Sequence, residues 1–268
     1  MENQPLPPED SVVEIGGNIE KALVGQYVIN PKAVITEAWQ KTTTTRLPIN
    51  IGLLFVLIIG MLSSLIFSQF LGGFEQVLQD PQASLILNLV VTIVIWPFLA
   101  GVEMMGVLHA VGLKTQPKLI FSFLRRGSWV AICSVMTSMF ISLGLQLLIF
   151  PGIFLAVVLS LSIPLVVEKQ MSPAKAIVLS VKALRFQWFN ILVTYLMLIG
   201  ALVCALVPMY LLRSSELFVV GAVIFIVTLS YIAPCYYNVK GVLYREIFGM
   251  KLQAVAAGEK GSNDTFIA

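Results

Sequence analysis

Six long apolar stretches constrain this chain more than any other feature of its sequence. A helix needs about 20 apolar residues to cross the roughly 30 Å hydrocarbon core of a bilayer. Each stretch approaches that length, and their approximate bounds are 48–71, 84–106, 128–150, 151–167, 190–212 and 217–237. Only 12% of the residues are charged and 58% are hydrophobic, which leaves too few polar side chains to surround a soluble core. The sequence therefore predicts an all-α membrane protein with about six transmembrane helices, arranged as three hairpins.

Basic residues are divided unequally between the two ends of these stretches. Sixteen of the 17 Lys and Arg residues fall before the first stretch, after the second, after the fourth or after the sixth. Only Arg213, between the fifth and sixth, falls in the opposite set. Because cytoplasmic loops of membrane proteins carry an excess of Lys and Arg, this partition predicts that both termini are cytoplasmic. We expect a multi-pass protein of a bacterial inner membrane.

A cytoplasmic segment that begins with proline precedes each predicted hairpin. The segments begin at Asn30-Pro31, Gln116-Pro117 and Ser172-Pro173. Asn and Ser are good N-caps and Pro suits the first helical position, so cytoplasmic interfacial helices are predicted there. The threefold pattern is either a true repeat or the ordinary alternation of loops and spans. Residues 1–30 and 248–268 are predicted to be cytoplasmic and partly disordered, on either side of a transmembrane domain of residues 31–247.

The most characteristic part of the chain runs from Phe121 to Trp188. It contains Pro151-Gly152-Ile153-Phe154, then Pro164 and Glu168, and then Ala176 and Ser180 in a predicted amphipathic helix. These positions resemble a family of uncharacterised bacterial inner-membrane proteins of the YciC type. They are also similar to the membrane domain fused to some glycerophosphodiester phosphodiesterases. The resemblance covers about a quarter of the chain and implies a six-span helical bundle, with Pro151, Gly152, Pro164 and Glu168 as a structural motif. It implies no established activity.

Polar side chains inside the apolar stretches are candidates for function, because burying them is costly. Glu103 and His109 lie near the inner end of the second stretch, and Asn88 and Gln146 are the main amides. Glu103 and His109 either line a polar cavity with these amides or simply lie at the cytoplasmic interface. In the second case, replacing Glu103 by Gln is expected to leave folding nearly unchanged. His109 is the only histidine, and no zinc motif or Ser-His-Asp arrangement is present, so we predict no metal, no cofactor and no enzyme activity.

Basic residues next to the third and fifth stretches are candidates for contacts with anionic lipid headgroups. They are Arg125, Arg126, Lys175, Lys182 and Arg185. In the predicted helix before the fifth stretch, apolar residues share one face and basic residues lie along another, which is typical of a helix on an anionic leaflet. The expected partners are membrane lipids, together with a second copy of the chain or another membrane protein. A net charge of only +3 argues against nucleic acid.

Two functions are compatible with these features. The sequence favours a non-enzymatic scaffold, assembly or lipid-interacting protein of the cell envelope. The alternative is a transporter or channel for an amphipathic or lipid-like solute. A polar or lipid-sized cavity within the membrane would favour transport, and a close-packed bundle would favour the scaffold.

Overall fold

The computed structural model describes residues 12–213 and 217–253 and is almost entirely helical. Six helical segments are long and apolar enough to cross a membrane, which confirms the predicted fold class. Many of their large apolar side chains are exposed, as expected for a surface that faces lipid. The protein is therefore a multi-pass membrane protein. The segments are α2 (Pro31–Phe70), α4 (Pro81–Ala110), Pro117–Leu147 ending in α5 (Gly127–Leu147), Ile149–Glu168 comprising α6 (Ile149–Val158) and α7 (Ser162–Glu168), α9 (Trp188–Leu211) and α10 (Phe218–Phe248).

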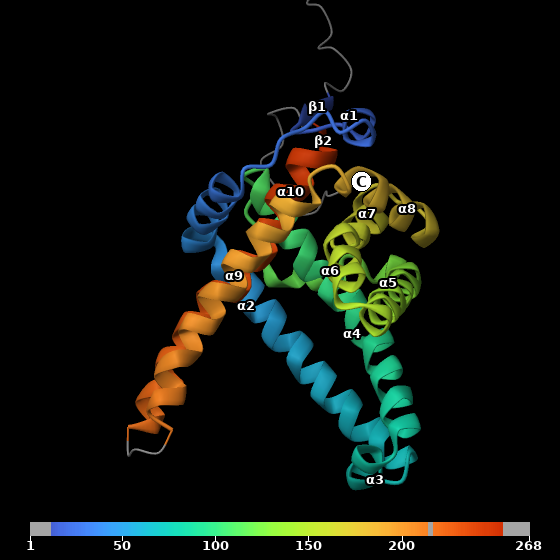
Figure 1. Ribbon diagram of the computed structural model, residues 1–268, viewed down its shortest axis with the longest axis vertical. Coiled ribbons are helices and arrows are strands. Elements are labelled where there is room, and N and C mark those ends of the chain that lie inside the picture. Colours follow the sequence, from blue (N-terminus) through green and yellow to red (C-terminus); the bar gives the residue numbers. More distant parts are fainter. Residues whose placement is uncertain (1–11, 214–216, 254–268) are drawn as a thin grey trace, which may run out of the picture.

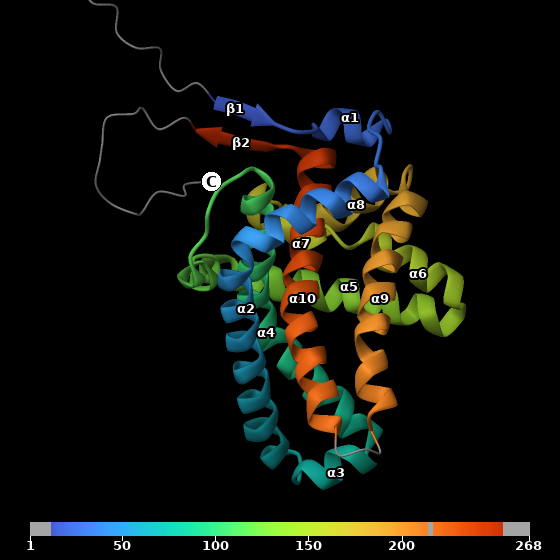
Figure 2. The ribbon, with the colours of Figure 1, turned by 90° about the vertical axis from the view of Figure 1, so that its left-hand side faces the viewer.

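Both described ends of the chain meet at one end of the bundle. Strand β1 (Val12–Ile15) pairs antiparallel with strand β2 (Met250–Gln253), and helix α1 (Ile19–Leu23) follows β1 (Figure 2). Helix α8 (Pro173–Leu184) contacts α1 at the same end of the bundle. We call this the basic end, because the connections that are rich in Lys and Arg lie here. Helix α3 (Phe74–Gln79) marks the opposite, far end (Figure 1). The strand pair requires an even number of crossings between β1 and β2, as the charge pattern predicts.

Helix α2 contains the first predicted interfacial helix and the first predicted span, joined at a kink. The Asn30 side chain accepts hydrogen bonds from the backbone N–H groups of Lys32 and Ala33, as expected of an N-cap. Thr45 departs from helical geometry (φ −127°, ψ 17°), three residues before Pro48, whose ring removes one backbone hydrogen bond. The part before the kink runs across the basic end, and the remainder runs toward α3 (Figure 2).

The second predicted interfacial helix does not form as an α-helix. This connection contains only two short 3₁₀ helices, η1 (Pro117–Phe121) and η2 (Leu124–Arg126). Ile120 lies against Gly101 of α4 so closely that a Cβ on that glycine would be 2.6 Å from the Ile120 Cα. Packing against α4 therefore holds this segment against the protein.

The core lies toward the basic end, where α4 and α10 cross backbone to backbone. A Cβ on Gly241 would overlap the carbonyl oxygen of Gly106, so only glycine permits this crossing. The buried residues of α4 are concentrated in 100–110, and those of α10 in 234–248. Toward the far end, the α2–α4 and α9–α10 hairpins diverge (Figure 1).

The α5–α6 hairpin is oriented differently from the other two hairpins. It lies across the direction shared by α2, α4, α9 and α10 (Figures 1 and 2). The ring of Phe150, at its turn, is 5.7 Å from that of Trp188, the first residue of α9. The third and fourth predicted stretches meet between residues 150 and 151, but the structure turns earlier, at Leu148. Pro151 and Gly152 both lie in the first part of α6, where Gly152 allows close packing on Leu145.

The fourth predicted span is broken into two helices. Helix α6 ends at Val158 and α7 begins at Ser162. Pro164 contributes to this break because proline has no N–H to donate to the carbonyl of Ser160. The two pieces leave a short non-helical connection inside the apolar part of the chain.

Candidate functional site

Helix α10 extends beyond the sixth predicted span and carries buried polar side chains. The sequence assigned Lys240 and Arg245 to the region after that span, but α10 continues to Phe248 and both residues are helical. Lys240 donates a hydrogen bond to Glu103 of α4 in an ion pair whose side chains are only 6% and 3% exposed. Burial on this scale is tolerated because each charge has a partner of opposite sign.

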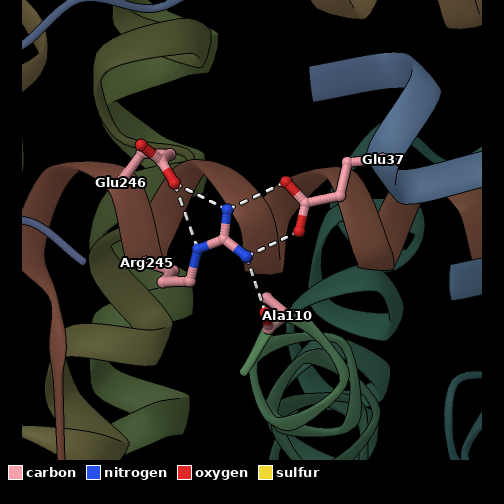
Figure 3. Close-up of polar contacts among 4 residues, drawn as sticks. All are labelled: Glu37, Ala110, Arg245 and Glu246. Carbon is pink, nitrogen blue, oxygen red and sulfur yellow. Dashed lines mark hydrogen bonds and ion pairs between the residues drawn. The ribbon is translucent and has the colours of Figure 1, made fainter. Parts of the chain in front are cut away.

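Two more residues of α10 contact carboxylates of other helices. The Tyr244 hydroxyl donates to Glu168 Oε2 at 2.7 Å, and Lys169 Nζ donates to Glu168 Oε1 at 3.1 Å. The Arg245 guanidinium binds both carboxylate oxygens of Glu37, at 2.6 and 2.9 Å, and donates to the carbonyl of Ala110 (Figure 3). We call the contacts of Lys240, Tyr244 and Arg245 the α10 network. The network ties α10 to α4, α7 and α2.

His109 lies in a separate polar cluster. Its Nδ1 is 3.0 Å from Asn238 Oδ1, and its Nε2 is 2.8 Å from the Thr115 hydroxyl. Because Asn238 Oδ1 can only accept, we assign the proton to Nδ1, and Nε2 then accepts from Thr115. The amide of Asn238 donates to Thr42 Oγ1 at 2.8 Å. Both ring nitrogens are therefore occupied: Nδ1 joins α4 to α10 and, through Asn238, to α2, whereas Nε2 binds the connection that follows α4.

The four residues predicted to line a polar cavity are not brought together. Glu103 and His109 belong to the two clusters above, and both are buried. Asn88 is exposed and donates to its own helix at the carbonyl of Ser84, at 2.9 Å. Gln146 is exposed in the last turn of α5. Within residues 12–213 and 217–253, no group of three or more His, Cys, Asp or Glu side chains could hold a metal ion.

The structure contains instead an apolar cavity that the sequence analysis did not identify. Its volume is about 740 Å³, within the usual range for small-molecule sites. The walls come from α6, α9 and α10, with Leu53 of α2, and almost all lining atoms are apolar. The hydroxyls of Ser160 and Tyr195 lie near each other at the wall, and neither makes a hydrogen bond of normal geometry to a described residue. The sequence held one signal for this site, namely tyrosines such as Tyr195 inside the apolar stretches. A buried tyrosine hydroxyl usually has a hydrogen-bond partner, so such residues are candidates for a polar contact within the membrane.

Helix α8 turns its apolar face toward the protein. Ile177 and Leu184 are buried, and the Ser180 hydroxyl donates to the carbonyl of Val158 at 2.6 Å. The Tyr27 hydroxyl donates to the carbonyl of Ala183 at 2.7 Å, and burial raises the pKa of Tyr27 to about 12. The predicted amphipathic helix is therefore present, but the rest of the chain covers its apolar face.

The residues predicted to contact headgroups lie mainly on the surface. Four of them are exposed, and Arg126 is partly buried and donates to Gln170 at 2.9 Å. The exposed four are Arg125, Lys175, Lys182 and Arg185. They remain accessible to lipid phosphates at the basic end.

No family model, no curated protein and no solved structure matches the chain. The resemblance to the YciC-type proteins stays a prediction. In this chain, Gly152 allows α5 and α6 to pack closely, Pro164 lies next to the α6–α7 break, and Glu168 joins α7 to α10.

Proposed function

We propose that this protein is a non-enzymatic, lipid-interacting protein of a bacterial inner membrane, with both termini cytoplasmic. Its cavity beside α6, α9 and α10 holds part of one bilayer lipid. The observation that carries the proposal is the cavity, whose walls are apolar and whose Ser160 and Tyr195 hydroxyls make no hydrogen bond of normal geometry within the described part of the chain. The exposed basic residues of α8 and of the α4–α5 connection support an anionic lipid surface at the basic end.

The chemistry of the cavity fits an acyl chain with its ester group. Apolar walls suit a hydrocarbon chain, because their atoms make van der Waals contacts with it and leave no polar group of the walls unpaired against it. The hydroxyls of Ser160 and Tyr195 can donate to ester carbonyl oxygens, which only accept. No charged residue is among the described residues that line the cavity, which argues against a phosphate or an ion as the group bound inside it.

Transport of the same kind of lipid is the second candidate function. The α6–α7 break favours it, because Ser160 lies both in this break and on the cavity wall. Helix breaks beside a binding site are common in transporters. Lipid movement between leaflets of proteoliposomes would separate transport from binding alone.

Filling the cavity tests the proposal. Ala233 lines the cavity, and Ala201, on α9, does not. We expect Ala233→Phe to reduce the retention of co-purifying lipid at least tenfold, measured by native mass spectrometry after detergent washing. Ala201→Phe is the matched control and should retain lipid as the unchanged protein does. A glycerolipid with a diazirine in its acyl chain should label peptides of α6, α9 and α10 preferentially.

The hydroxyl pair gives an independent readout. The double change Ser160→Ala and Tyr195→Phe should preserve the apolar volume and weaken retention of ester lipids relative to ether lipids of the same chain length. Equal retention of lipid by the Ala201 and Ala233 variants, with diazirine labelling spread evenly over all spans, would exclude the cavity as the site.

A further inference from the structure

The turn between α5 and α6 differs in composition from the other two turns between paired apolar segments. The turn after α2 contains Glu75 and Asp80, and the connection before α10 contains Arg213 in its sequence. The α5–α6 turn consists of four apolar residues whose exposed fractions are 79%, 68%, 73% and 68%, namely Leu147, Leu148, Ile149 and Phe150. No charged residue occurs anywhere in 127–167. A turn that emerged into water would expose this apolar tip at a high cost in free energy.

Aromatic contacts place this turn at the depth where α9 begins. Phe150 and Phe154 both pack edge to face on Trp188, with ring centroids 5.7 and 5.6 Å apart. Trp188 is the first residue of α9, a helix of 24 residues that is about 36 Å long at 1.5 Å per residue. Phe150 is therefore separated from the far end of α9 by roughly the thickness of the hydrocarbon core.

The length of α6 agrees with this placement. Its 10 residues span only about 15 Å, half of the hydrocarbon thickness. Helix α5 is longer, at 21 residues, but it lies across the bundle axis (Figure 2). Neither helix connects the basic end to the level of α3.

We infer that α5 and α6 form a re-entrant hairpin: it enters the bilayer from the basic end, its apolar tip lies among the acyl chains of that leaflet, and it returns to the same side. Four helices, α2, α4, α9 and α10, then cross the membrane completely. The 16-to-1 division of basic residues is the same for a crossing hairpin and a re-entrant one, because both return the chain to the side from which it entered. The charge pattern therefore does not distinguish the two.

Cross-linking in the membrane tests the placement of the tip. In a chain whose native cysteines are replaced by alanine, Phe150→Cys combined with Trp188→Cys should be joined by a short bis-methanethiosulfonate reagent, as identified by mass spectrometry. Gln76→Cys combined with Trp188→Cys is the matched control and should not be joined, since Gln76 belongs to α3 at the far end. A hairpin that crossed the bilayer would separate positions 150 and 188 by its full thickness and give no product.

Accessibility measurements identify what surrounds the tip. We expect Leu148→Cys to resist a membrane-impermeant maleimide from either side, whereas Gln76→Cys reacts from the far side and Gln116→Cys from the basic side. Bimane attached at Leu148→Cys should be quenched by phospholipids brominated in their acyl chains. Maleimide labelling of Leu148→Cys from the far side would show a complete crossing, and bimane that is not quenched would show a tip buried in protein. Either result would overturn the inference.

Discussion

The buried Glu103–Lys240 ion pair makes a quantitative prediction about stability. Replacing Lys240 by Met keeps most of the side-chain volume and removes the charge that compensates Glu103. Glu103 Oε2 has no hydrogen-bond partner among the described residues, so no other group there can take over the role of Lys240. Breaking one partner of a buried pair costs about 3–5 kcal/mol. For a domain of this size, that corresponds to a fall in Tm of about 6–20 °C.

A double-mutant cycle separates the interaction energy of Glu103 with Lys240 from the cost of burying each charge. The combined change of Glu103→Gln and Lys240→Met removes both charges, and we expect it to recover most of the loss, because replacing both partners of a buried pair is often neutral. Glu103→Gln alone should also destabilise, since it leaves a buried ammonium group. This replaces the sequence-based expectation that Glu103→Gln leaves folding unchanged, which assumed a residue at the membrane interface.

The assay is reversible unfolding in mixed lipid–detergent micelles, followed by tryptophan fluorescence. Lys175→Met is the matched control, because Lys175 is exposed on α8. This substitution should change the free energy of unfolding by less than about 0.5 kcal/mol. The reasoning fails if Lys240→Met costs less than about 1 kcal/mol, or if the double variant loses the sum of the two single losses.

Three further changes test other contacts by the same assay. Gly241→Ala should destabilise the protein by at least about 1–3 kcal/mol, because the new Cβ would overlap the Gly106 carbonyl. Gly200→Ala is the control: no atom lies within 4 Å of its new Cβ, so it should be neutral or slightly stabilising. Equal effects of the two changes would refute the close crossing. Arg245→Lys should cost about 1–3 kcal/mol, because lysine cannot bind a carboxylate through two N–H groups, and no loss would exclude a stabilising role for the bidentate contact. Tyr27→Phe should cost about 1–3 kcal/mol, because the partly buried carbonyl of Ala183 then loses its hydrogen bond from the Tyr27 hydroxyl. Unchanged stability would show that water replaces the hydroxyl.

Several features of the fold and of the site could be predicted from short segments of sequence. The Asn30 N-cap depends on one side chain and the two backbone N–H groups that follow it. The kink near Pro48 depends on a ring that removes one hydrogen bond. The amphipathic character of α8 is visible in its sequence, although the sequence did not reveal that α1, α5, α6 and α7 would pack against it.

The candidate site was less accessible because its residues lie far apart in the chain. Glu103 and Lys240 are separated by 137 positions, so the sequence around either residue does not indicate which residue it pairs with. The sequence grouped Glu103 with His109 because they are close in the chain, but the side chains belong to separate clusters on α4. Tyr195 and Ser160 likewise meet only because α6 lies beside α9.

The sequence by itself determined that the chain belongs in a membrane and how many apolar segments it has, and it predicted that both termini lie on one side. These properties follow from hydropathy and from charge, which are sums over neighbouring residues. Only the tertiary structure decided which carboxylate each α10 side chain binds, where the cavity lies and which way the α5–α6 hairpin runs. Those features depend on close contacts between helices, such as Gly106 against Gly241 and Phe150 against Trp188, and a hydropathy pattern does not specify which helices touch.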